Sequence, residues 1–285
     1  MKLLRVGVPG RERPAILDGQ GRARDLSDHV PDIAGAALLP ESLGRLAEVD
    51  VDGLPVLDGA ERIAPCVGAV GKLVGIGLNY ADHAAEANVD LPSEPIIFLK
   101  ATSALSGPFD DVVLPAGSTM TDWEVELGVV IGTPGKDIEE DRALDHIAGY
   151  AVVNDYSERD YQLRTAGRWT PMARQWTKGK SCDTFAPLGP WLVTADEIAD
   201  PQALDLWLTV DGRRYQNSST AKMVFGVAHL VSYVSRFMSL QSGDVIATGT
   251  PAGVGMGQSP EVYLRRGQTV RAGITGVGEM EQRVA

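Results

Sequence analysis

Two glutamates lie two residues apart in the stretch TDWEVELGVVIG, residues 121–132, which is otherwise rich in apolar residues. Side chains at positions i and i+2 of a β-strand share one face, about 6.5 to 7 Å apart along the chain. Glu124 and Glu126 therefore point to the same side. Buried carboxylates need a partner, because losing their hydration costs several kcal/mol per ion.

A third acidic residue, Asp155, follows the apolar run GYAVVN at 149–154. Three carboxylates from two neighbouring strands would offer oxygen ligands to Mg²⁺ or Mn²⁺, at roughly 2.0 to 2.2 Å. A solvated strand face is the alternative for a Glu-x-Glu pair. Gly128, Val130 and Gly132 continue the same face without polar groups, so the acidic pattern is local, as expected of a site.

Three carboxylates around a divalent cation leave one negative charge, which would repel an anionic substrate unless other cations lie nearby. Arg159 lies four residues after Asp155, and Lys180 lies in TKGKSCDTF, where Gly179 permits close approach of the backbone. An ordinary surface charge is the alternative for each. Both are candidate cations of the site.

The segment GLNYADHAAEANVD places His83 directly after an apolar strand. If the segment is helical, His83 and Glu86 share a face and can hydrogen-bond. The carboxylate would then fix the imidazole tautomer and raise its basicity, so that the pair activates a water. A surface pair on a short helix is the alternative.

The glycine-rich stretch TGTPAGVGMG at 248–257 follows a predicted strand. It offers backbone N–H groups and the Thr250 hydroxyl to an anion, and a long turn is the alternative. Gly75-Ile-Gly77 lacks the third glycine of a dinucleotide fingerprint, and Gly179-Lys180-Ser181 lacks the upstream glycine of a phosphate loop. Neither motif supports a nucleotide site.

Short strands would position most of these residues. The patterns predict a hairpin at Asp211-Gly212 and strands at 73–78, 96–100, 123–131, 149–154, 204–210 and 243–248. A short helix opens within 157–164, and a longer one is predicted over 221–240, with a core-facing stripe of Val224, Val227, Leu230, Val231, Val234 and Phe237. Many short strands and 32 glycines favour a mainly β fold with some α-helix.

The N-terminal part reads as short strands broken at Pro9-Gly10 and Asp18-Gly19, which predicts a small β-rich domain. A stretch at 55–71 that contains proline and glycine precedes the strand KLVGIGL. We therefore place a boundary near residue 70, between an N-terminal domain over 1–70 and a catalytic domain over 71–285.

The chain has 285 residues, 44% of them hydrophobic, which is enough for a substantial core. Its formal charge of −12 opposes nucleic acid and anionic lipid. The start MKLLRVGVPG lacks an apolar signal core, and no segment has about 18 consecutive apolar residues. We expect a cytoplasmic protein with a small anionic substrate and without a nucleic-acid or membrane partner.

Six motifs resemble, in order, those of the fumarylacetoacetate hydrolase family: GIGLNYADHAAE, PIIFLKATSAL, DWEVELGVVIG, VVNDYSERDYQ, GKSCDTFAPLGPW and GDVIATGTPAGVG. They cover about residues 71 to 257. The resemblance implies a mixed β-roll fold, a homodimer, and Mg²⁺ or Mn²⁺ held at the positions of Glu124, Glu126 and Asp155.

The same resemblance implies roles for six further residues. His83 and Glu86 match a water-activating pair on a mobile lid, and Lys180 matches a lysine beside the metal. The positions that match substrate contacts are Arg159, Gln162 and Thr250.

Over its full length the pattern is similar to a branch that handles 2,4-diketo-3-deoxy sugar acids, notably those of L-rhamnonate or L-fuconate. That implies hydrolysis of the C3–C4 bond to pyruvate and a second carboxylic acid, in sugar-acid catabolism. Oxaloacetate decarboxylase, acylpyruvase, hydroxymuconate-type isomerase and ureidoglycolate lyase activities are alternatives on the same scaffold. A keto-acid-binding sensor is the non-enzyme alternative.

Overall fold

The computed structural model describes residues 1–57, 59, 61–86, 90–165, 168–169 and 175–285. Within them, one large mixed sheet contains β1 (Lys2–Val6), β2 (Arg13–Leu17), β3 (Ala23–Asp25), β4 (Leu73–Gly77), β5 (Ile96–Lys100), β6 (Leu105–Ser106), β8 (Val125–Ile131), β9 (Ile147–Asn154), β13 (Ala186–Thr194) and β16 (Val245–Ala247). The strand order is β3-β2-β1-β13-β9-β8-β16-β4-β5, with β6 beside β13. The pairs β16–β4 and β13–β6 are parallel, and the other neighbours are antiparallel.

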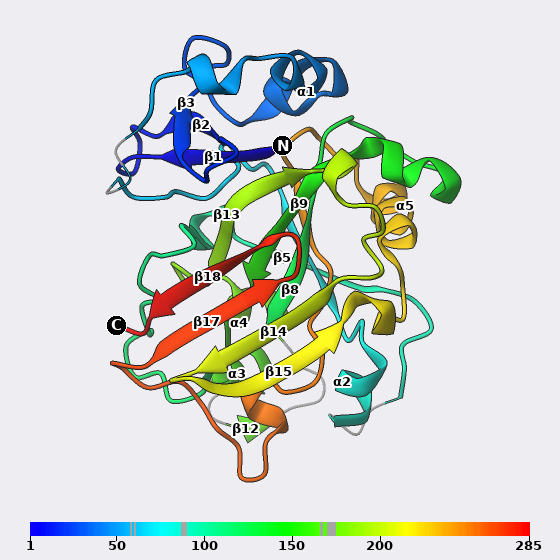
Figure 1. Ribbon diagram of the computed structural model, residues 1–285. Coiled ribbons are helices and arrows are strands. Elements are labelled where there is room, and N and C mark those ends of the chain that lie inside the picture. The colour runs from blue at the N-terminus through cyan, green and yellow to red at the C-terminus, as the bar shows by residue number, and fades with distance from the viewer. Residues whose placement is uncertain (58, 60, 87–89, 166–167, 170–174) are drawn as a thin grey trace.

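A smaller antiparallel sheet packs across β8 and β9 of the large one (Figure 1). Its order is β15-β14-β17-β18, with the bounds β14 (Asp205–Val210), β15 (Arg213–Ser219), β17 (Thr269–Ile274) and β18 (Gly278–Arg283). Two short ribbons pair β7 (Thr121–Asp122) with β10 (Ser157–Glu158) and β11 (Arg164–Thr165) with β12 (Arg168–Trp169). Every residue of β8 and β9 is buried. Both faces of these strands are therefore covered by other parts of the protein, which explains their continuous runs of apolar residues.

The helices are short and lie around the sheets. They are α1 (Pro40–Ala47), α2 (Ala81–Glu86), α3 (Arg159–Leu163), α4 (Trp176–Lys180) and α5 (Val227–Phe237). The 3₁₀ helices are η1 (Gly35–Leu38), η2 (Val51–Gly53), η3 (Thr102–Ala104), η4 (Glu140–His146), η5 (Ala195–Glu197), η6 (Thr220–Lys222) and η7 (Gly255–Gly257). Among the described residues, none of these helices has the length and hydrophobicity needed to cross a membrane. The strand-rich architecture with small helices confirms the predicted mainly β fold with some α-helix.

All six predicted strands of the main part are present, as β4, β5, β8, β9, β14 and β16, with ends shifted by a few residues. The predicted hairpin turn joins β14 to β15, with positive φ at both Asp211 (49°) and Gly212 (78°). Among the described residues of this part, nine further strands were not predicted by residue range: β6, β7, β10, β11, β12, β13, β15, β17 and β18. Two prolines interrupt the pattern of β13, and polar residues dominate β15 and β18.

The predicted helix over 221–240 is too long. The segment forms η6 and then α5, which begins after Gly226 and ends at Phe237. Phe237 was expected in the core but is 62% exposed, and its ring lies 5.0 Å from that of Tyr233. Val227, Leu230, Val231 and Val234 are buried, but Phe237 at the end of α5 is not, so helical spacing alone predicted too long a core-facing stripe.

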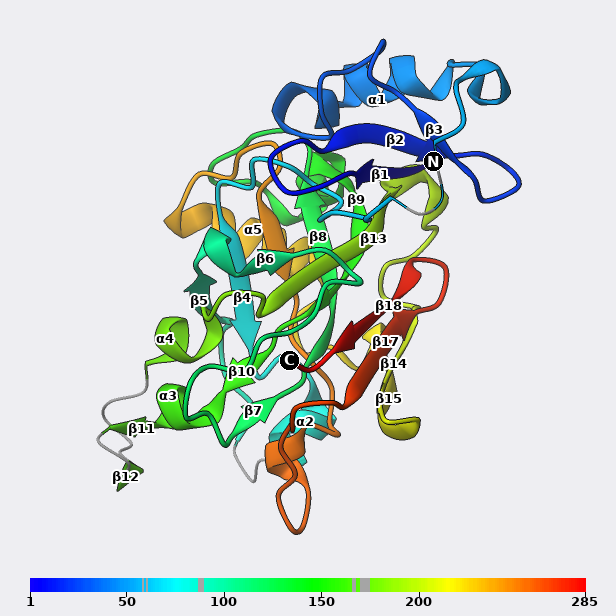
Figure 2. The same cartoon turned by 90° about the vertical axis from the view of Figure 1, so that its left-hand side faces the viewer.

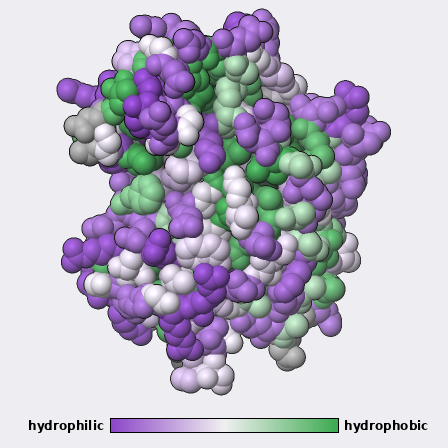
Figure 3. Space-filling model, viewed as in Figure 1, coloured by the Kyte–Doolittle hydropathy of each residue, from purple (hydrophilic) through white to green (hydrophobic). Residues whose placement is uncertain are grey.

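The N-terminal strands extend the large sheet, because β1 pairs with β13 (Figure 2). Lys2 and Leu3 lie opposite Val193 and Leu192. The apolar residues gather between the sheets and under α5. On the face in Figure 3, hydrophilic side chains cover most of the surface and hydrophobic areas are smaller.

Candidate metal centre

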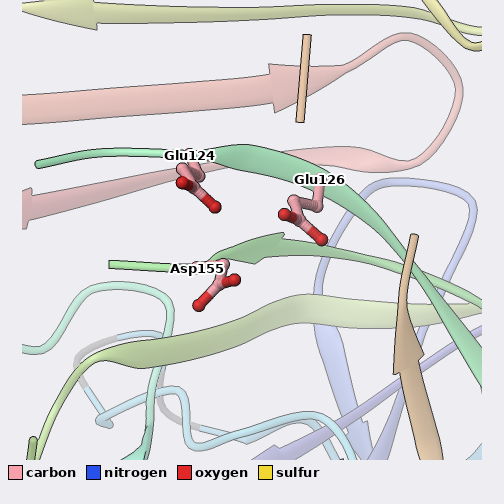
Figure 4. A group of neighbouring side chains, drawn as sticks. All are labelled: Glu124, Glu126 and Asp155. Atoms are coloured by element: carbon pink, nitrogen blue, oxygen red, sulfur yellow. The ribbon is translucent and has the colours of Figure 1, made fainter. Parts of the chain in front are cut away.

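Glu124, Glu126 and Asp155 lie together where β8 begins and β9 ends. One carboxylate oxygen from each residue lies within 4.8 Å of those of the other two. All three side chains are buried, and the two glutamates project from the same side of one strand (Figure 4). The Asp155 N–H donates to the Glu124 carbonyl at 2.8 Å, which joins the two strand ends. The antiparallel pairing of β8 and β9 thus brings the acidic residues together.

The two candidate cations contact this triad. The Lys180 Nζ, at the end of α4, lies 2.5 Å from Glu124 Oε2 and 2.6 Å from Asp155 Oδ2. The Arg159 Nη2, at the start of α3, lies 2.7 Å from Glu124 Oε1 and 2.8 Å from Asp122 Oδ2. Both side chains are buried, so neither is a surface charge.

Lys100 is a third cation of the site, which was not predicted from the sequence. It ends β5, and its side chain is fully buried. Its Nζ lies 2.5 Å from Asp155 Oδ1 and 3.2 Å from the Tyr156 carbonyl oxygen. The feature of the sequence that could have predicted this role is a lysine at the end of an apolar strand. Burial lowers the pKa of Lys100, and the charge of Asp155 opposes this.

With all four carboxylates ionised, negative charge exceeds positive charge in this buried cluster by one. Its members are the carboxylates of Asp122, Glu124, Glu126 and Asp155 and the cations Lys100, Arg159 and Lys180. A divalent cation would reverse the excess to one positive charge, which suits an anionic substrate. Lys100 offsets the charge of Asp122, the fourth buried carboxylate, so the net charge equals that of the triad with Arg159 and Lys180 alone.

The carboxyls of Glu124 and Glu126 have opposite electrostatic environments. Burial raises the pKa of Glu124, but the charges of Lys180 and Arg159 outweigh this and lower its pKa to about 2. Burial, together with the charges of Asp155 and Glu124, raises the pKa of Glu126 well above its ordinary value. The present cations therefore leave Glu126 uncompensated. Three buried oxygen donors with one uncompensated charge fit Mg²⁺ or Mn²⁺.

His83 and Glu86 share a face of α2, as the spacing predicted. His83 Nδ1 lies 3.2 Å from Glu86 Oε2, and the Gly253 N–H donates to the other oxygen, Oε1, at 2.9 Å. His83 is buried, and the loop whose Gly253 N–H binds Glu86 also binds Glu126 of the triad through the Gly249 N–H. The pair is therefore part of the same site.

The glycine-rich loop at 248–257 binds the protein's own carboxylates. Its N–H groups donate to Glu126 from Gly249 (2.8 Å), to Asp82 from Ala252 (3.3 Å), to Glu86 from Gly253 (2.9 Å) and to Asp122 from Gly255 (2.6 Å) and Met256 (3.1 Å). These donors are not left for an external anion. The loop instead connects the acidic strand to the helix that carries His83.

The two remaining predicted residues take part in hydrogen bonds within the protein. Gln162 Oε1 accepts from Arg159 Nη1 at 3.0 Å. The Thr250 hydroxyl donates to the Val125 carbonyl at 2.9 Å and accepts from Gln216 Nε2 at 2.7 Å. Gln216 was not predicted, because it is one of many polar residues in β15. Its side-chain oxygen also accepts from the Val125 N–H at 3.0 Å. Thr250 and Gln216 thus hold the start of β8, and the substrate roles of Gln162 and Thr250 stay predictions.

Gly253→Ala is expected to destabilise the protein by more than about 2 kcal/mol, measured by urea unfolding. Gly253 has φ +105°, and an added Cβ would lie 2.0 Å from the Tyr215 carbonyl oxygen. The control is Gly267→Ala, where φ is +89° but nothing lies within 4 Å of the added Cβ. This control measures the cost of a positive φ without a steric clash. Equal losses from the two variants would contradict a steric role for Gly253.

Comparison with known proteins identifies relatives over the whole chain. Residues 72–285 match the family described as fumarylacetoacetate (FAA) hydrolase C-terminal. A Burkholderia multivorans protein, whose name gives the class hydrolase and no substrate, is 60% identical over 283 residues, which are 99% of this chain and 98% of that protein.

Two solved structures are similar over 100% of this chain and 99% of their own. The fumarylacetoacetate hydrolase of Exiguobacterium antarcticum has a TM-score of 0.86 and 35% identity. The maleylpyruvate hydrolase of a Sphingobium species, solved with manganese(II) and pyruvate, has a TM-score of 0.82 and 29% identity. A member of this group thus holds a divalent cation together with a 2-keto acid.

Proposed function

Because the chain belongs to the fumarylacetoacetate hydrolase family, we propose that it is a divalent-metal-dependent hydrolase that cleaves the C3–C4 bond of a 2,4-diketo acid. The products are pyruvate and a second carboxylic acid. The observation that carries the proposal is the buried triad of Glu124, Glu126 and Asp155 beside a cationic cluster and the His83–Glu86 pair. The 2,4-diketo-3-deoxy acids of L-rhamnonate or L-fuconate are the substrates we propose.

The triad would hold Mg²⁺ or Mn²⁺, which supplies Lewis-acid stabilisation of the negative charge that develops on the substrate oxygens. The residues of the chain supply the charge balance around it. With a divalent cation, the buried cluster carries one net positive charge, which attracts the substrate carboxylate. Lys180 adds its ammonium charge beside Glu124 and Asp155.

His83 would be the general base. Glu86 accepts from the Nδ1 side of the ring, which leaves Nε2 to take a proton from water. The resulting hydroxide attacks C4 and forms the new C–O bond. The C3–C4 bond then breaks, and its electron pair stays with the pyruvate fragment, which takes up a proton at C3.

The proposal is tested with a panel of 2,4-diketo-3-deoxy sugar acids, acylpyruvates and oxaloacetate in H₂¹⁸O, with Mn²⁺ present. Hydrolysis predicts pyruvate together with a second acid that carries one ¹⁸O from water, both measured by mass spectrometry. A decarboxylase would release CO₂ instead of a labelled second acid, and an isomerase would give one product of unchanged mass. Metal-dependent binding without turnover of any panel member would favour the keto-acid sensor.

A further inference from the structure

Lys100 and Lys180 are two buried lysines that share one aspartate. Lys100 contacts Asp155 at Oδ1, and Lys180 contacts the same carboxylate at Oδ2. Their side chains are 0% and 2% exposed. Two ammonium groups on opposite oxygens of one buried carboxylate fix its orientation, because rotation would break one of these contacts.

The two lysines differ in what else they contact. Lys180 Nζ also binds Glu124 Oε2 at 2.5 Å, so it bridges two of the three residues of the triad. A cation that binds both Glu124 and Asp155 competes with that bridge. Lys100 has the Tyr156 carbonyl as its second acceptor, at 3.2 Å, and it touches neither glutamate. Its contact with Asp155 is compatible with a bound cation.

We propose that Lys100 is a positioning residue, which holds Asp155 Oδ1 so that the carboxylate is oriented for a divalent cation, whereas Lys180 competes with that cation. The inference rests on the metal site of the proposed function and is independent of the substrate. Groups that orient a metal ligand by hydrogen bonding contribute about 10- to 100-fold to metal affinity. Removing a competing ammonium has the opposite effect, because it frees two carboxylate oxygens.

The test is calorimetric titration of the full-length protein with Mn²⁺ in the absence of substrate. We expect Lys100→Met to raise the Kd for Mn²⁺ by about 10- to 100-fold and Lys180→Met to lower it. The matched control is Lys72→Met, since Lys72 also pairs with a buried aspartate, Asp244, at 2.6 Å. That pair joins β4 to β16 outside the triad, so the control should leave the Kd unchanged.

Opposite shifts in the two lysine variants would support the inference. Unchanged or tighter Mn²⁺ binding by Lys100→Met would overturn it, since Lys100 would then act only as a repelling charge. Unchanged or weaker binding by Lys180→Met would overturn the competition between Lys180 and the cation. If the wild-type protein does not bind Mn²⁺, the proposed function fails together with this inference. If wild type binds Mn²⁺ and Lys100→Met binds it equally well, only this inference fails.

A second measurement does not depend on the folding of a variant. In a crystal structure of the wild-type protein with Mn²⁺, Lys100 Nζ is expected to keep its hydrogen bond to Asp155. Lys180 is expected to have left at least one of its two carboxylates. A structure in which Lys100 has moved away and Lys180 still bridges Glu124 and Asp155 would overturn the inference.

Discussion

Glu126→Gln is expected to abolish metal-dependent hydrolysis, lowering kcat/KM by on the order of 10³-fold, because a bound cation contributes several kcal/mol of transition-state stabilisation. The substitution keeps the shape of the side chain and an acceptor for the Gly249 N–H, which now bonds to Glu126 at 2.8 Å. It removes the charge that a divalent cation would balance. Mn²⁺ affinity, measured by calorimetry, should fall together with activity.

In the metal-free protein, Glu126→Gln is expected to keep or increase the stability of the fold. The pKa of Glu126 is raised by burial and by its two acidic neighbours, so its ionised form is unfavourable there. The Tm of Glu126→Gln should therefore equal or exceed that of the wild type without metal, and wild type should gain more Tm on adding Mn²⁺. The exposed Glu281→Gln is the control and should change neither quantity. Full activity of Glu126→Gln would exclude Glu126 as a metal ligand.

His83→Ala is expected to lower kcat for hydrolysis by about 10²- to 10⁴-fold, the usual contribution of a general base. Mn²⁺ affinity should be retained, because His83 lies on α2 and is not one of the three carboxylates. The measurement combines initial rates of pyruvate release with Mn²⁺ titration. Glu86→Gln should cause a smaller loss of kcat, since it weakens the orientation of the ring and leaves the imidazole in place.

The control for this experiment is His29→Ala, which removes an exposed histidine from the N-terminal part. It should leave kcat and metal affinity unchanged. If His83→Ala hydrolyses diketo acids at the wild-type rate while Glu126→Gln is inactive, His83 does not activate water. Loss of hydrolysis with unchanged decarboxylation of oxaloacetate would instead support the assigned role, because decarboxylation needs no activated water.

Much of the fold could be predicted because its signals are local. The period of two placed Glu124 and Glu126 on one face, and the apolar runs predicted β8 and β9. The Asp211-Gly212 turn predicted the hairpin between β14 and β15. Among the strands that were missed, β13 contains two prolines and β18 is mostly polar, so their strand conformation depends on the partner strands beside them.

By itself, the sequence determined the chemical types present in the site: three carboxylates, a histidine–glutamate pair and candidate cations. Only the tertiary structure decided which groups meet. Lys100 contacts Asp155, which lies 55 residues away in the sequence. The loop N–H groups that were predicted to bind an anion instead bind Glu126, Glu86 and two aspartates. Spacing along a chain reports which residues share a face, whereas the pairing of distant strands decides which charges share a buried, low-dielectric site and so how strongly they interact.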